Sequence, residues 1–182
     1  MSDEVRRILS ALRRSAPRAG ATRVVAVDGR SGAGKTSLAA SLAGQLEAPV
    51  LSLEGLYGGW DGLEHGIDLL VSDVLKPLAA GVAARVPSYD WVAREWAEPL
   101  LLEPPDVLIV EGVGAGARRA AAFESLLVWL EAPAPTRKKR ALARDGDTFA
   151  PYWDQWAAQE EKLLAREHTS NRADIVINSA PD

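Results

Sequence analysis

The sequence predicts one three-layer α/β/α domain around a mainly parallel sheet of five strands. The first observation is that apolar, β-branched runs alternate with helical segments along the 182 residues. The second is a glycine-rich turn at residues 29–34, which follows the first apolar run and precedes a helical segment. The third is that neither a repeat nor a linker divides residues 1–182, so we expect a single domain.

Composition narrows the class of protein before any motif is considered. Hydrophobic residues make up 47% and charged residues 25% of the chain, which is typical of a globular domain. The net charge of −4 disfavours a nucleic-acid partner. Without cysteine and with only 2 histidines, a thiolate or histidine-rich metal site is excluded. The chain has no long apolar run and starts with a charged segment, so we expect a cytoplasmic protein without a membrane partner.

The first elements follow from apolar spacing. Residues 3–14 space their apolar side chains at helical intervals and predict an amphipathic helix within a flanking segment, 1–20. Residues 23–28 (RVVAVD) are apolar on both faces, as in a buried parallel strand. A helix continues to residue 46, and a short strand is expected at 49–53. Glycines and aromatic residues then predict a loop over 54–66.

The middle of the chain contains the clearest strand. We expect a helix over residues 67–80 and an irregular element over 87–99, where the signals are mixed. Residues 106–112 (DVLIVEG) predict a central strand. A glycine- and alanine-rich turn, a helix over 118–122 and a strand over 125–132 follow.

The last part of the chain predicts a lid and an edge strand. A basic helix is expected over residues 134–144 and a second helix over 152–167. We interpret residues 134–168 as a short helical lid and the helix that follows it. Residues 173–178 (ADIVIN) predict the last strand of the sheet.

The turn after the first strand matches a phosphate-binding loop. Residues 29–36 (GRSGAGKT) fit the pattern G-x-x-x-x-G-K-[ST] completely. Glycines let the backbone N–H groups and the following helix N-terminus face phosphate oxygens. In such loops the lysine contacts the β- and γ-phosphates, and the hydroxyl ligates Mg²⁺. We therefore expect ATP and Mg²⁺ as cofactors, with these nucleotide-binding residues: Gly29, Ser31, Gly32, Ala33, Gly34, Lys35, Thr36 and Ser37.

Carboxylates follow two other predicted strands. Glu111 ends the central strand, and Glu54 comes just after the second strand. Parallel strands present their carboxyl ends on one edge of the sheet, so both carboxylates should meet the phosphate-binding loop there. Two carboxylates beside a triphosphate suit a metal ligand and a general base. We expect Asp28, directly before the loop, to hold the loop's shape and to take no part in the chemistry.

Several classes of protein carry such a loop. A GTPase would need an Asn-Lys-x-Asp guanine-recognition segment, which the sequence lacks, and motor or oligomeric ATPases are usually larger. A small-molecule kinase fits the length and the aromatic residues after the second strand. A nucleotide-binding regulator without kinase activity and a nucleoside monophosphate kinase remain as alternatives. A homo-oligomer is also left open.

These segments together resemble the uridine kinase-like branch of the P-loop kinases. The opening VAVDGRSGAGKTSLA, the segment LSLEGLY, the acidic loop DGLEHGID, the element VPSYDW, the strand DVLIVEGV, the lid start TRKKRALARD and the closing RADIVIN occur in the family's order. The resemblance spans about residues 23–178. It implies the P-loop NTPase fold and transfer of the ATP γ-phosphoryl group to a hydroxyl of a small molecule, often a nucleoside.

The resemblance also assigns roles to residues. It implies that Lys35, Glu54 and Arg144 are catalytic: the lysine stabilises the transferring phosphate, Glu54 accepts the acceptor's proton, and Arg144 is the lid arginine. Metal binding is expected from Thr36, Glu54 and Glu111. The expected acceptor-binding residues are Glu54, Tyr57, Asp61, Tyr89, Trp91 and Arg94.

The chain departs from the family at three places. Glutamate stands at position 54, where the family has aspartate, and Arg94 stands where a uridine kinase has a base-contacting histidine. The lid continues from Arg144 without the family's further arginines. These departures predict an acceptor other than uridine, such as one with an anionic group for Arg94.

Overall fold

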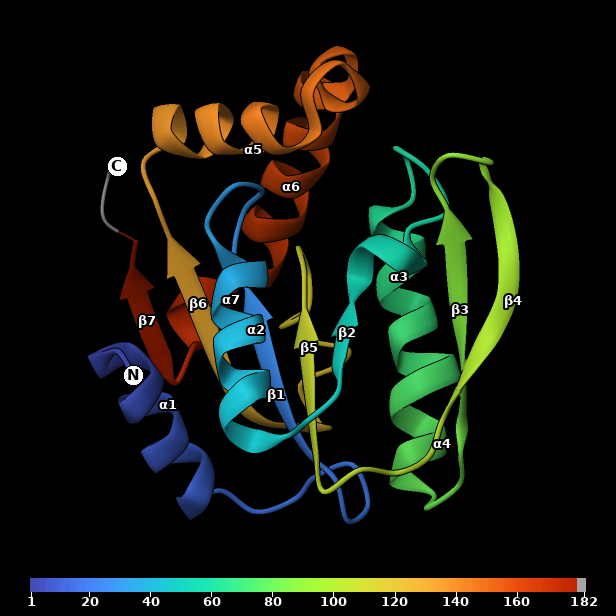
Figure 1. The fold of residues 1–182 in the computed structure, drawn as a ribbon, viewed down its shortest axis with the longest axis vertical. Helices are drawn as coiled ribbons and strands as arrows, with labels where there is room; N and C mark the ends of the chain where they lie inside the picture. The colour runs from blue at the N-terminus through green and yellow to red at the C-terminus, as the bar shows by residue number, and fades with distance from the viewer. Residues whose placement is uncertain (180–182) are drawn as a thin grey trace.

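A parallel five-stranded sheet forms the centre of the protein in a computed structural model that describes residues 1–179, apart from the side chains of Asp145 and Asp147. The strand order is β2-β5-β1-β6-β7 (Figure 1). Every neighbouring pair in this sheet is parallel, as the sequence predicts. The strands are β1 (Arg23–Asp28), β2 (Val50–Ser52), β5 (Val107–Glu111), β6 (Glu124–Glu131) and β7 (Ile175–Asn178).

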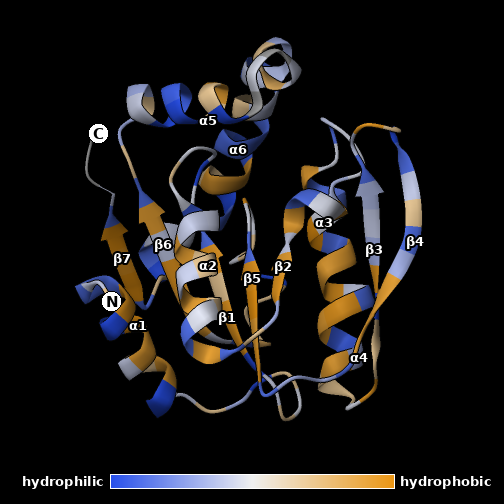
Figure 2. Ribbon diagram, in the orientation of Figure 1, coloured by the Kyte–Doolittle hydropathy of each residue, from blue (hydrophilic) through white to orange (hydrophobic). Residues whose placement is uncertain are grey.

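Helices cover both faces of the sheet, which confirms the three layers. Alternate residues of β1 point into separate cores: Val24 and Ala26 into one, Val25 and Val27 into the other. The second core contains the apolar faces of α1 (Asp3–Arg14) and α2 (Lys35–Leu46). The first contains those of α3 (Leu63–Leu69) and α6 (Trp153–Glu167). Both faces of the sheet are therefore buried, and its strands are strongly apolar (Figure 2).

The segment after β2 is more helical than the sequence predicts. Instead of a loop over 54–66, the chain forms a 3₁₀ turn, η1 (Leu53–Leu56), and α3 begins at Leu63. Gly66 lies inside α3, where a Cβ would come within 2.6 Å of the Tyr57 ring. This glycine therefore permits close packing and does not mark a turn. The helix continues through η2 (Leu70–Leu75), a π-helical stretch, into α4 (Lys76–Ala79).

A β-hairpin replaces the irregular element expected over residues 87–99. Its strands β3 (Ala84–Asp90) and β4 (Glu95–Leu102) are antiparallel and stand beside α3 (Figure 1). At the turn, the Asp90 carboxylate accepts the backbone N–H groups of Val92 and Ala93 at 2.8 and 2.9 Å. Prolines within both strands and a register shift hide the alternation that normally predicts a hairpin.

The helix expected over residues 118–122 is absent from the described chain, where this segment forms turns. Inside the segment, the backbone N–H groups of Ala120 and Ala121 donate to carbonyls three residues back, at 2.8 and 3.2 Å, as in successive turns. Two buried carboxylates hold the chain at its start: Asp28 accepts from Gly116 at 2.9 Å, and Glu167 accepts from Arg118 at 2.8 Å. Neither carboxylate is close in sequence, so the local pattern could not show these contacts.

The predicted lid lies across the carboxyl ends of the strands. Helix α5 (Ala134–Phe149) runs along this edge, and η3 (Ala150–Tyr152) turns the chain back into α6 (Figure 1). Gly146, at φ 51° and ψ −133°, interrupts the helical geometry of α5. A short helix, α7 (Thr169–Arg172), then leads to β7. Within residues 1–179, no helix is long and apolar enough to cross a membrane.

Candidate active site

The phosphate-binding loop lies between β1 and α2, as predicted. Gly32 has φ +79°, and a Cβ there would come within 2.1 Å of the carbonyl oxygen of Arg137 in α5. Glycine is thus required by both the backbone conformation and the close approach of the lid helix. Lys35, the first residue of α2, is buried, and its Nζ donates to the carbonyl oxygen of Arg30 at 3.1 Å.

A buried carboxylate from α6 holds the same loop. Glu160 is 1% exposed and accepts the backbone N–H of Ser31 at 2.8 Å and Nε of Arg30 at 3.1 Å. The indole N–H of Trp156 lies 3.0 Å from both Glu160 Oε1 and Ser31 Oγ. Burial lowers the pKa of Lys35, and the nearby Glu160 carboxylate opposes that shift. Glu160 therefore fixes the loop and favours the charged form of its lysine.

Asp28 connects the loop to the segment after β5. It is fully buried and accepts backbone N–H groups from Gly29, Gly114 and Gly116 at 2.6, 3.0 and 2.9 Å. Burial raises the pKa of Asp28, while these hydrogen bonds oppose the shift. The arrangement agrees with the expectation that Asp28 shapes the loop.

Glu111 and Thr36 form an oxygen pair beside Lys35. Thr36 Oγ1 and Glu111 Oε2 are 3.4 Å apart at the start of α2 and the end of β5. Mg²⁺ at nucleotide sites takes one or two protein oxygens and completes its octahedron with phosphate oxygens and water. The pair fits this requirement. In the described part of the chain, no group of three or more histidine, aspartate or glutamate residues forms a separate metal cage.

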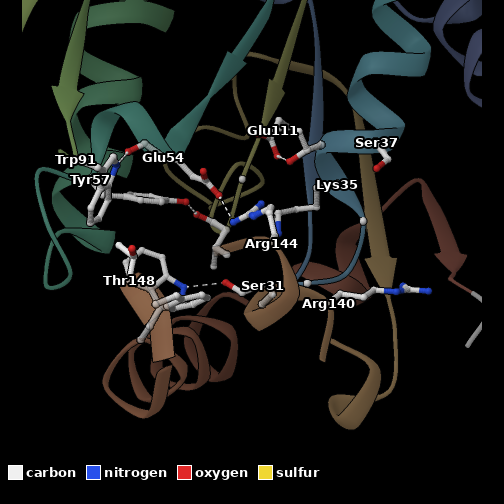
Figure 3. A pocket seen from close by; sticks show the side chains of 18 of the residues that line it. Ser31, Lys35, Ser37, Glu54, Tyr57, Trp91, Glu111, Arg140, Arg144 and Thr148 are labelled. Carbon is white, nitrogen blue, oxygen red and sulfur yellow. Dashed lines mark hydrogen bonds and ion pairs between the residues drawn. The ribbon is translucent and has the colours of Figure 1, made fainter. Parts of the chain in front are cut away.

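Glu54 and Arg144 face each other from opposite sides of the site. Glu54 belongs to η1, just past β2, and Arg144 to α5. Arg144 Nη2 donates to Glu54 Oε1 at 3.0 Å, and both side chains are about half exposed (Figure 3). This ion pair joins the lid to the base predicted for catalysis.

One cavity of about 570 Å³ brings these groups together. It is lined by all three residues predicted to be catalytic, namely Lys35, Glu54 and Arg144, and by both Thr36 and Glu111 (Figure 3). Ser31, Gly32, Gly34 and Ser37 of the nucleotide-binding set also line it. Gly29 and Ala33 of that set are buried behind it.

The structure places three of the six predicted acceptor-binding residues in the cavity lining. Tyr57 and Trp91 line the cavity, as Glu54 does, whereas the other three lie outside its lining. Asp61 accepts a hydrogen bond from Gln155 of α6 at 2.6 Å. Tyr89 packs against Trp91 from behind, with ring centroids 5.4 Å apart. Arg94, at φ 59°, is exposed in the β3–β4 turn, so an anionic acceptor in this cavity would not reach it by this geometry.

An aromatic surface closes the end of the cavity near Glu54. We name it the acceptor wall, and its members are Tyr57, Trp60, Trp91, Phe149 and Trp156. Trp60 stacks on Phe149 with ring centroids 5.1 Å apart and is tilted against Trp91 at 4.7 Å. Sequence reasoning missed Phe149 and left Trp156 between adenine stacking and helix packing, because α5 and α6 fold back over the sheet only in three dimensions. Their one sequence signal is the aromatic enrichment of residues 149–156.

The fold is shared with two solved proteins that are provisionally described as kinases. The protein described as a possible uridine kinase from Bacillus stearothermophilus aligns over 96% of this chain and 97% of its own, with a TM-score of 0.70 and 20% identity. The chain therefore has the same α/β fold as this protein. A protein provisionally described as a fructose transport system kinase from Silicibacter sp. TM1040 has the same P-loop kinase fold, with a TM-score of 0.61, 21% identity, and 95% and 96% coverage of the two chains. The resemblance expected from the sequence is confirmed at the level of the fold.

The amino-acid sequence of this chain is similar to those of cytidylate kinases. It is 33% identical over 133 residues to that of Pseudomonas aeruginosa (strain UCBPP-PA14), covering 70% of this chain and 57% of the relative. The cytidylate kinase of Pectobacterium atrosepticum is 37% identical over 105 residues, or 55% of this chain and 44% of its own. The chain thus spans about half the length of the curated relatives it matches. No family model matches it.

Proposed function

We propose that this chain is an ATP- and Mg²⁺-dependent kinase that transfers the γ-phosphoryl group to a hydroxyl of a small molecule. One observation carries the proposal: Glu54 and Arg144 face Lys35, Thr36 and Glu111 within one cavity. A protein that only binds nucleotide has no need of a carboxylate opposite its phosphate-binding loop. The family resemblance favours a nucleoside-like acceptor.

The side chains have distinct roles in this proposal. Lys35 and the loop backbone hold the phosphates, while Thr36 and Glu111 hold the metal. Bound Mg·ATP would supply the phosphoryl group, and its Mg²⁺ would neutralise the charge that develops on the phosphate oxygens. Glu54 orients the acceptor hydroxyl in line and accepts its proton, and Arg144 moves from the carboxylate to the phosphates.

Two variants test the proposal through ADP release. Lys35→Ala should lower turnover by about a hundredfold or more because phosphate stabilisation is lost. Glu54→Gln should lower kcat by about a hundredfold or more, with nucleotide affinity retained, because the base is lost. Glu98→Gln, an exposed glutamate of β4, is the matched control. Full activity in Glu54→Gln would assign the base to another group.

A nucleoside monophosphate kinase is the second candidate. The sequence similarity to cytidylate kinases favours it. That reaction needs cations for the acceptor phosphate, and the described lining supplies Arg140 and Arg144 besides Lys35. ADP release that requires CMP would support this candidate. Nucleotide binding without ADP release for any acceptor would instead indicate a nucleotide-binding regulator without kinase activity.

A further inference from the structure

The acceptor end of the cavity has little capacity for hydrogen bonds. Its aromatic wall carries four polar atoms, and three of them already donate within the protein. The Tyr57 hydroxyl donates to the Val113 carbonyl at 3.0 Å, and the Trp91 indole N–H donates to the Glu54 carbonyl at 2.9 Å. The Trp156 indole N–H is shared by Ser31 and Glu160. The fourth polar atom is the indole nitrogen of Trp60, so the wall offers an acceptor at most one further N–H donor.

The charged groups at this end oppose each other. Glu54 and Arg144 form an ion pair, so their charges balance each other at the acceptor end. The other arginine of the cavity lining, Arg140, donates to Ser179 Oγ at 2.8 Å beside the end of β7 and points away from Glu54 (Figure 3). An acceptor phosphate at this end would face the Glu54 carboxylate, which repels it, and would have to compete with that carboxylate for Arg144.

An acceptor with an apolar ring system fits these surroundings better than a polar acceptor does. Indole and phenol rings stack with flat apolar groups in offset and tilted arrangements. Each polar group that such a wall buries without a partner weakens binding by about tenfold or more. The edges of a uracil or cytosine base carry several such groups, and a hexose carries more.

We propose that the acceptor is an uncharged alcohol whose body is an aromatic ring system with few hydrogen-bonding groups, packed on the acceptor wall with its hydroxyl at Glu54. This inference rests on the proposed kinase function for the reaction but concerns binding alone. The Trp91 ring is its central contact, because Trp91 lies against Trp60 and also holds the backbone of Glu54.

Binding is measured by calorimetry in the presence of Mg²⁺ and a non-hydrolysable ATP analogue. The panel is naphthylmethanol, uridine, cytidine, CMP and fructose. We expect naphthylmethanol to bind at least about tenfold more tightly than every other member. Tighter binding of a nucleoside, of CMP or of fructose overturns the inference, and so does a panel in which nothing binds.

Three tryptophan variants locate the bound alcohol. Trp91→Ala should weaken naphthylmethanol binding by about tenfold, whereas Trp91→Phe, which keeps a ring, should weaken it by about threefold or less. Trp96→Ala removes the same side chain from β4, outside the cavity lining, and should leave affinity unchanged. Equal losses in Trp91→Ala and Trp96→Ala would place the alcohol elsewhere and overturn the inference.

ADP release separates this inference from the kinase proposal. Tight binding of naphthylmethanol, with no ADP release from ATP for any member of the panel, supports the binding of an aromatic alcohol at the wall and contradicts the kinase function. ADP release that is fastest with CMP or a nucleoside supports a kinase and overturns the acceptor class.

Discussion

Replacing Glu160 with glutamine tests how α6 controls the phosphate-binding loop. The substitution keeps the size of the side chain and removes its charge. One amide oxygen can still accept from Ser31 and Trp156, but the amide nitrogen then faces Nε of Arg30. The charge-assisted hydrogen bond is thereby lost, and two donors face each other in its place.

The expected loss of stability follows from these contacts. A hydrogen bond to a charged group contributes about 1.5–3 kcal/mol, and breaking a buried ion pair costs about 3–5 kcal/mol. The Arg30 side chain is 28% exposed and can turn towards water, which limits the penalty. We therefore expect Glu160→Gln to lower the free energy of unfolding by about 2–4 kcal/mol.

The variant should also change the pH dependence of nucleotide binding. Burial lowers the pKa of Lys35, and Glu160 is the foremost of the carboxylates that oppose this shift. Without that carboxylate, the pKa of Lys35 falls further, and the lysine loses its proton at lower pH. Mg·ATP affinity should thus begin to decline at lower pH in Glu160→Gln than in the wild type.

Urea unfolding and calorimetry across a pH series measure both effects. Glu161→Gln is the matched control because Glu161 is the next residue and is exposed. If Glu160→Gln stays within about 0.5 kcal/mol of this control and the alkaline decline does not move, the carboxylate does not hold the loop.

Two further variants probe the interior and the loop. Burial raises the pKa of Glu124 from 4.5 to about 8, so the folded state keeps a proton that the unfolded chain releases, and the free energy of unfolding should fall as pH rises through this range. In Glu124→Gln that decline, about 5 kcal/mol in total, should be absent, whereas Glu98→Gln should retain it. Equal slopes in the wild type and Glu124→Gln would contradict the assignment. Gly32→Ala places a Cβ against the Arg137 carbonyl and should lower the free energy of unfolding by about 2–5 kcal/mol. The same substitution should weaken nucleotide binding. Gly44→Ala in α2, where a Cβ meets nothing within 4 Å, should instead be neutral or slightly stabilising, and calorimetry showing normal ATP affinity in Gly32→Ala would refute the requirement for glycine.

Local patterns in the sequence determined the sheet and one half of the site. The β1 run is apolar on both faces because both faces are buried, and this pattern can be read without any tertiary contact. The phosphate-binding loop is contiguous in sequence, so its glycines, Lys35 and Thr36 could be identified directly. Glu54 and Glu111 could be placed beside it because parallel strands end on the same edge of a sheet.

Only the tertiary structure decided how the loop is held and what surrounds the acceptor. Glu160 lies 129 residues beyond Ser31, and no local signal distinguishes it from an exposed helical glutamate such as Glu161. The acceptor wall joins aromatic side chains from the loop after η1, the hairpin turn, α5 and α6. Asp61 and Arg94 were expected at the acceptor from their order in the sequence, but the turn geometry and a hydrogen bond to α6 direct them elsewhere. Segment order fixes which elements meet, whereas the direction of each side chain depends on partners distant in the chain.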